Sequence, residues 1–315
     1  MQNSALKRAC LVAALLGLFA TSHAQGQSGR ALELISFNGT TWRYLKDGSD
    51  QGTAWTARTF NDSGSPWASG QGLLGYETTP AVYPYPFNTT FAGYDPLVLT
   101  YYFRAHFTLA ASDFVPFMTM VATNFADDGA VVFLNGTEVA RIRVPAGQNS
   151  TTLSPGPAAE GQYEVNSIAT NALLVGDNVI AVEVHQANNA SSDIVHGMSL
   201  FANYPAVSSV AFTSQPQGGT YNVGSAVTLS ATTSGGPVFY QWQTNNGSGV
   251  YVDIPGATSS NYFTGTLTVA GTNSYRLIAS NSVNSVVSSV AVIAVVSDTF
   301  GICSCPRRSS NRIHR

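Results

Sequence analysis

Two adjacent carboxylates, Asp127 and Asp128, have the strongest potential for chemistry in the sequence. They precede Gly129 and the apolar run 130–134, so they should lie on a turn that leads into a buried strand. Calcium takes about six to eight oxygen ligands, and this pair could supply some of them, with Asn124 and loop carbonyls as helpers. Alternatively, the two carboxylates shape the turn by accepting backbone N–H bonds. Both roles, a calcium site and a turn, remain open.

A second group of ionisable residues lies further along the chain. Glu183 and His185 are two residues apart in an expected strand, so they share a face, and Asp193 follows on the next loop. With His196, they could form a metal or acid–base site of a hydrolase. Alternatively, they hydrogen-bond to neighbouring strands and loops. The sequence contains no His-Glu-x-x-His, Cys-x-x-Cys, phosphate-binding glycine loop or Gly-x-Ser-x-Gly. We therefore expect no enzymatic activity.

Three tryptophans, Trp42, Trp55 and Trp67, lie in or beside the glycine- and serine-rich segment 47–75. An exposed aromatic ring can stack on the apolar face of a sugar. Alternatively, each ring anchors its loop onto the body of the domain. The complete set of candidate ligand-binding residues is Trp42, Trp67, Asp127, Asp128, His185 and Asp193.

The elements that must position these residues are short strands. Residues 101–109 alternate, with Tyr101 and Phe103 on one face and Arg104 on the other. Asn135-Gly136 predicts a tight hairpin turn. Many short strands separated by turn residues indicate an all-β fold, a sandwich or jelly roll, over residues 25–204.

The first half also resembles a known family. The runs that carry the resemblance are Trp42-Arg43-Tyr44, Tyr101-Tyr102-Phe103-Arg104, Asp127-Asp128-Gly129 with the strand and Asn-Gly turn after it, and Gly176-Asp177-Asn178 with the strand that follows. Together they resemble the galactose-binding-like jelly-roll modules of exported bacterial proteins. That resemblance implies a jelly-roll β-sandwich, often found beside hydrolase domains. The Asp-Asp pair is also similar to that of the PA14-type adhesin lectins, which implies calcium at Asp127 and Asp128 and sugar hydroxyls on the calcium.

The second half, residues 205–297, resembles an immunoglobulin-like domain. One expected strand carries Trp242, and a later one opens with Tyr275. In that family the inter-sheet cysteines would fall at Ala231 and Leu277, and neither is Cys here. The resemblance implies a smaller β-sandwich without the disulfide.

The N-terminus predicts export. Lys7 and Arg8 precede an apolar run and the small residues that end at Ala24, which is typical of a secretory signal peptide over residues 1–24. The apolar run is shorter than the roughly 20 residues that span a bilayer. We therefore expect a secreted or cell-surface protein with no membrane span in the mature chain.

Charge and cysteine content limit the partners. Residues 25–297 contain eight basic and sixteen acidic side chains and no cysteine, so a basic surface for nucleic acid is not expected. Residues 298–315, which include Cys303 and Cys305, are predicted to be a disordered basic tail or the end of a truncated longer protein.

Two functions follow from these patterns. The first is a non-catalytic surface or secreted module that binds carbohydrate, a glycan or cell-surface polysaccharide, or is adhesive, with the immunoglobulin-like domain as a spacer. The second is the accessory region of an exported hydrolase, metallophosphoesterase-like or glycosidase, whose catalytic domain lies elsewhere. No cofactor is certain, and calcium is the one candidate.

Overall fold

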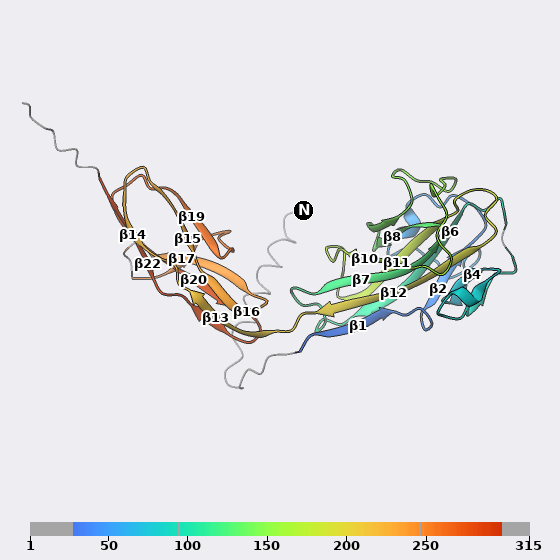
Figure 1. Ribbon diagram of the computed structural model, residues 1–315, viewed down its shortest axis with the longest axis horizontal. Coiled ribbons are helices and arrows are strands. Elements are labelled where there is room, and N and C mark those ends of the chain that lie inside the picture. Colours follow the sequence, from blue (N-terminus) through green and yellow to red (C-terminus); the bar gives the residue numbers. More distant parts are fainter. Residues whose placement is uncertain (1–27, 94, 246, 248, 298–315) are drawn as a thin grey trace, which may run out of the picture. The chain divides into compact units, whose positions relative to one another are not determined.

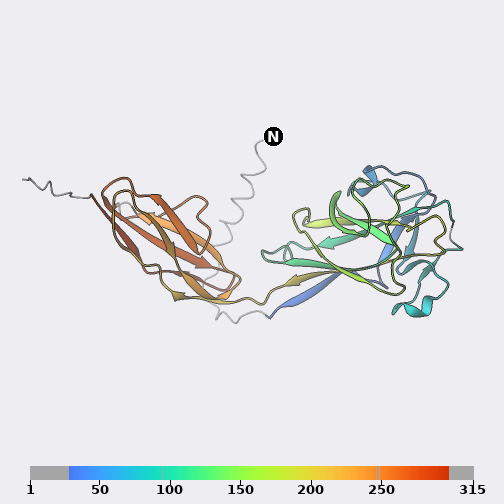
Figure 2. The ribbon, with the colours of Figure 1, turned by 45° about the horizontal axis from the view of Figure 1, so that its top comes forward.

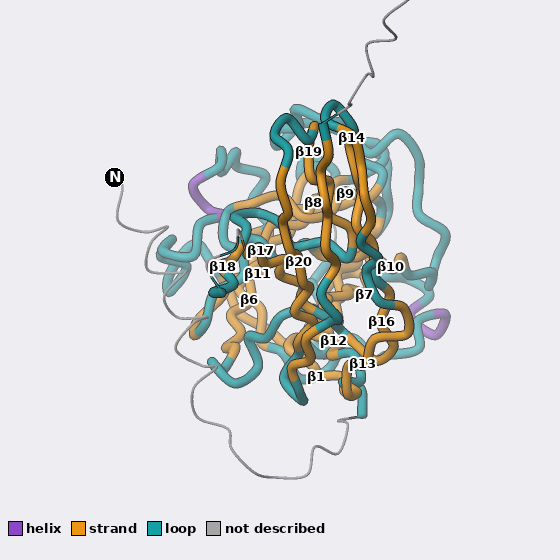
Figure 3. Tube along the Cα trace, turned by 90° about the vertical axis from the view of Figure 1, so that its left-hand side faces the viewer, coloured by secondary structure: helices purple, strands orange, loops and turns teal. Residues whose placement is uncertain are grey.

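The computed structural model describes residues 28–93, 95–245, 247 and 249–297 (Figure 1). They form two compact units, 29–205 and 206–297. Both units are all-β, as predicted, and the helices described are single short turns, η2 (Ala54–Thr56) and η3 (Pro80–Val82) (Figure 3). Among these residues, none of the helices is long and apolar enough to cross a membrane. The predicted signal peptide, 1–24, and the basic tail, 298–315, lie outside the described residues.

The first unit is a jelly-roll β-sandwich of two six-stranded sheets (Figure 2). The first sheet has the order β10 (Glu164–Ile168), β7 (Thr119–Asp127), β12 (Ile194–Tyr204), β4 (Leu74–Tyr76) and β5 (Thr89–Thr90), and β1 (Arg30–Ile35) also pairs with β12. The second has the order β3 (Ala68–Gln71), β2 (Thr41–Leu45), β6 (Thr100–Leu109), β11 (Gly176–His185), β8 (Gly129–Leu134) and β9 (Thr137–Ile142).

Alternating apolar side chains fill the space between these sheets. On β6, Tyr101, Phe103 and every second residue to Leu109 are buried in the main core. The opposite face of β6 differs from the simple half-buried pattern, because Arg104 is buried as well. The segment 46–67 covers that face and packs Trp55 against Tyr102.

The predicted Asn-Gly hairpin joins β8 and β9. Asn135 and Gly136 have φ angles of 50° and 89°, the left-handed conformation that a two-residue hairpin turn requires and that these two residue types adopt most readily. The Asn135 side chain also donates to Asn178 Oδ1 and accepts from the Val179 N–H. These two hydrogen bonds tie the turn to β11, the strand that pairs with β8.

The second unit is the smaller, immunoglobulin-like β-sandwich. Its largest sheet has the order β14 (Gly219–Asn222), β22 (Ala291–Val296), β20 (Gly271–Ser280), β17 (Phe239–Asn245) and β18 (Val252–Asp253), with β21 (Ser285–Val287) beside β20. Two strand pairs complete it, β15 (Ala226–Ser230) with β19 (Asn261–Thr266) and β13 (Ser208–Ser214) with β16 (Thr232–Gly236).

The core of this unit is centred on Trp242, as expected. Trp242 is fully buried, and its indole N–H donates to the Ser259 carbonyl at 2.9 Å. Ala231 and Leu277, which stand where an inter-sheet disulfide would lie, are both buried in the same cluster. Apolar packing thus takes the place of the covalent link.

Candidate metal centre

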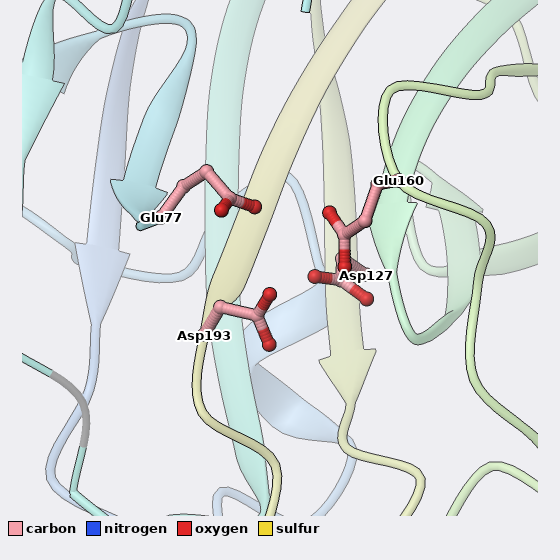
Figure 4. A group of neighbouring side chains, drawn as sticks. All are labelled: Glu77, Asp127, Glu160 and Asp193. Atoms are coloured by element: carbon pink, nitrogen blue, oxygen red, sulfur yellow. The ribbon is translucent and has the colours of Figure 1, made fainter. Parts of the chain in front are cut away.

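Four carboxylates meet at one edge of the first sheet of the jelly-roll unit. Glu77, Asp127, Glu160 and Asp193 each place one oxygen within 4.8 Å of the others. Figure 4 shows the four side chains turned toward a common space. They come from four separate segments of the chain.

Strand register explains this meeting. The four strands β10, β7, β12 and β4 are consecutive neighbours in the sheet. Asp127 ends β7 opposite Val195, while Asp193 directly precedes β12 and Glu77 directly follows β4. Glu160 lies on the loop just before β10. Because antiparallel strands alternate in direction, these ends and starts all fall at the same edge.

The innermost of these groups is Asp127, whose side chain is oriented into the cluster. Asp127 is 4% exposed, and its Oδ2 atom is buried without a hydrogen-bond partner among the described residues. Glu77 Oε2 is likewise buried without a hydrogen-bond partner among the described residues. A buried carboxylate oxygen that finds no donor is costly, so these oxygens require a proton or a cation.

The surroundings raise the pKa values of three of the four carboxyl groups. Burial raises the pKa of Asp127 to about 9, helped by the neighbouring Asp128 carboxyl and the charge of Asp193. Burial and the Glu77 carboxyl raise the pKa of Glu160 to about 7. Burial and the charges of Glu77 and Asp128 also raise the pKa of Asp193. Each shift reports that a negative charge here is unfavourable without a counterion.

The pKa of Glu77 moves the other way. Burial raises it, but hydrogen bonds from the Thr79 N–H, the Glu160 side chain and the Thr79 hydroxyl outweigh burial, so its pKa lies below the ordinary value. Glu77 therefore stays ionised and can serve as an anionic ligand.

The dimensions suit calcium. Calcium–oxygen bonds are about 2.3–2.6 Å long, so one ion can touch oxygens up to about 5 Å apart, and the four carboxylates meet that limit. The nearby cation is already engaged, because Arg143 pairs with Glu164 and donates to the carbonyls of Ala126 and Asp128. The donor set is all oxygen, which calcium prefers.

The expectation that Asp127 and Asp128 act together needs correction. The Asp128 carboxylate accepts the N–H groups of Ala158 and Ala187, at 3.0 and 2.6 Å. It thus serves as the turn-forming group and holds two loops, while Asp127 alone enters the cluster. Asn124, expected as a helper, donates instead to Asn166.

Glu183 and His185 do share a face, as expected, with 3.5 Å between Oε1 and Nε2. Asp193, however, belongs to the carboxylate cluster. His185 Nδ1 lies 3.0 Å from the Thr100 hydroxyl and 2.8 Å from the Thr152 carbonyl. The expected role of His185 as a ligand-binding residue is therefore replaced by a buried structural contact.

The loop tryptophans are also corrected. Trp42 and Trp67 are 0% and 6% exposed, so neither ring is available for stacking on a sugar. Trp42 packs edge-on against His196, and Trp67 packs against Phe60. The alternative reading, rings that anchor their loops, describes both.

His196 is a core residue. It stacks on Phe103 at 4.2 Å between ring centroids and has no hydrogen-bond partner for either ring nitrogen among the described residues. Burial lowers its pKa to about 3. Because the folded pKa lies below the unfolded value, the unfolded chain binds the proton first, so His196 makes the protein lose stability as the pH falls below about 6.5.

We expect His196→Phe to remove this loss. Between about pH 6 and pH 4, the free energy of unfolding of the wild type should fall relative to the variant by about 1.4 kcal/mol per pH unit. Urea titrations of both proteins at several pH values measure the difference. Parallel pH profiles would show that His196 does not titrate in this way.

Sequence reasoning missed Glu77 and Glu160. Each is a single acidic residue in its loop, and no sequence motif marks it. Only the strand order, which places β4 and β10 on either side of β12 and β7, brings them to Asp127.

Comparisons with known proteins give distant matches among solved structures. No protein-family model and no curated protein matches the sequence. A β-glucuronidase from Ruminococcus gnavus in complex with C6-substituted uronic isofagomine matches 87% of this chain and 47% of its own, with 10% identity and a TM-score of 0.33. A chimeric titin Z1Z2 functionalized with a KLER exogenous peptide from decorin matches 30% of this chain and 99% of its own, with 22% identity and a TM-score of 0.24. The chain thus spans less than half the length of the β-glucuronidase.

Proposed function

We propose that this chain is a non-catalytic, exported module whose jelly-roll domain binds calcium and a glycan. The immunoglobulin-like domain acts as a spacer or second adhesive unit. The observation that carries the proposal is the cluster of Glu77, Asp127, Glu160 and Asp193, with a buried, unpartnered oxygen on Asp127.

A cation explains this cluster better than acid–base catalysis does. Glycosidases use one pair of carboxyl groups that flank the scissile sugar bond, whereas here four carboxyl groups each place an oxygen within 4.8 Å of the others. Two cavities of the jelly-roll unit are lined by other side chains. The convergence of four carboxyl groups on one space favours an ion.

The proposed ion has a solvent side. Glu160 is exposed and Glu77 and Asp193 are half-buried, while Asp127 forms the inner wall. Four carboxylates leave part of the coordination sphere of about six to eight oxygens unfilled. Water or glycan hydroxyls can complete it. This geometry supports the glycan role.

Calcium titration by calorimetry tests the proposal. We expect binding whose affinity rises with pH, because Asp127 and Glu160 hold protons in the free protein that calcium must displace. At pH 7, binding should release roughly one proton or more. The measured heat should therefore change with the ionisation enthalpy of the buffer.

Asp127→Asn should lose calcium binding. Its matched control is Asp47→Asn, which alters an exposed carboxylate that accepts the Ser49 N–H in its own loop. It should bind calcium like the wild type. A glycan array probed with calcium and with EDTA then tests the sugar. The absence of any calcium heat at pH 8 would end the proposal, and calcium binding without any glycan would reduce it to a structural ion.

A further inference from the structure

A cavity of about 380 Å³ opens on the outer face of the second sheet of the jelly-roll unit. It lies between the segment that covers β6 and the loop that follows β9. The lining residues come from both loops and from β6, β8, β9 and β11, among them Thr53, Trp55, Phe133, Gln148 and Glu183. Its volume is at the lower end of the roughly 300–1,000 Å³ range of small-molecule sites.

The floor of this cavity is aromatic and rigid. Trp55 packs edge-on against Tyr102, with 4.9 Å between ring centroids, and against Phe133 at 5.9 Å. Trp55 and Tyr102 are almost fully buried, while Phe133 is half-buried. Phe133 is therefore the ring that offers apolar surface to a ligand.

The polar groups around the floor are acceptors and neutral donors. Glu183 is 5% exposed, and Gln148 Nε2 donates to its Oε1 at 2.5 Å, which fixes the carboxylate at the cavity wall. The charge of Glu138 is offset by Arg141, at 2.6 Å. Asp50 adds a further carboxylate, and no lysine or arginine is among the described residues that line the cavity.

This combination selects a ligand class. The Glu183 and Asp50 carboxylates at the cavity wall repel anions and accept hydrogen bonds from hydroxyl groups. Asn149 and Ser150 also line the cavity and carry no charge. A half-exposed ring beside such groups suits the apolar face of a sugar ring.

We propose that this cavity is a sugar-binding site that takes a neutral monosaccharide or disaccharide and does not require the cation. None of the four clustered carboxylates lines it. It therefore goes beyond the proposed calcium site, and either proposal can fail alone.

Saturation-transfer NMR on the full chain tests the cavity directly. The probes are glucose, galactose, mannose, N-acetylglucosamine, lactose, maltose and cellobiose, with glucuronate as the anionic comparison. We expect at least one neutral sugar to bind in EDTA as well as in calcium, and glucuronate to bind about tenfold more weakly than that sugar, because of the wall carboxylates.

Two variants change the cavity while sparing the fold. Thr53 is exposed and its side chain makes no capping hydrogen bond, so Thr53→Trp should fill the cavity and abolish sugar signals, while Thr53→Ser should leave them intact. Gln148→Ala removes the donor that fixes Glu183, and should weaken binding about tenfold. Asp127→Asn should bind sugar like the wild type.

The outcomes separate the two proposals. No signal from any neutral sugar, or unchanged binding in Thr53→Trp, would overturn the cavity site. Sugar binding that disappears in EDTA and in Asp127→Asn but survives in Thr53→Trp would assign the sugar to the carboxylate cluster and refute this inference.

Discussion

Replacing Asp127 by Asn should raise the melting temperature of the calcium-free protein and abolish the further rise that calcium gives the wild type. In the folded state the pKa of Asp127 is about 9, far above its value in the unfolded chain. The proton is therefore bound more tightly by the folded protein, and stability falls as the pH rises between the two pKa values. Asparagine removes that loss at neutral pH.

Calcium should stabilise the wild type far more than it stabilises Asp127→Asn. A ligand at about 100 times its dissociation constant stabilises by about 2.7 kcal/mol, which for a unit of this size raises the melting temperature by about 5–10 °C. Asp127→Asn loses the innermost anionic ligand, so its calcium affinity should fall at least about 100-fold. The variant should be the more stable protein in EDTA and should gain little or no further stability in calcium.

Differential scanning calorimetry in EDTA and in calcium measures both effects. Asp47→Asn, the exposed control, should follow the wild type in both buffers. If Asp127→Asn lowers the melting temperature in EDTA and leaves the calcium response intact, the carboxylate is a structural hydrogen-bonding group and the metal centre is refuted.

The architecture could be read from the sequence because it depends on local periodicity. The alternation on 101–109 and the Asn135-Gly136 turn each involve neighbours along the chain, and the structure confirms both. The burial of Trp242 could likewise be predicted, because a large apolar residue in an apolar strand is expected in the core.

The site was harder to predict, because it depends on which strands are neighbours. Asp127 stood out through its position before a buried strand, but Glu77 and Glu160 join it only through the order β10-β7-β12-β4. The same limitation explains why the burial of Trp42 and Trp67 could not be predicted from the sequence. A glycine-rich segment predicts a loop but does not tell whether that loop folds back over a sheet, as 46–67 does around Trp55.

Arg104 is buried by the covering segment 46–67 and also holds that segment in place. In sequence it shares a strand face with His106, yet Arg104 is fully buried and His106 is exposed. The Arg104 guanidinium donates through Nε to Asp62 Oδ2 at 2.7 Å and through Nη1 to the carbonyls of Trp55 and Ala57. One side chain from the sheet therefore holds the covering segment at several points.

We expect Arg104→Met to destabilise the jelly-roll unit by about 3–5 kcal/mol, because it leaves the buried Asp62 carboxylate and the Trp55 carbonyl without their partner. Urea unfolding measures the loss, and limited proteolysis should cut within 46–67 at native conditions. Arg58→Met is the control, since Arg58 is 42% exposed and 3.8 Å from Asp177, and such a surface pair contributes about 0–1 kcal/mol. Equal losses in the two variants would mean that the segment is held by the packing of Trp55 and Trp67 rather than by the guanidinium.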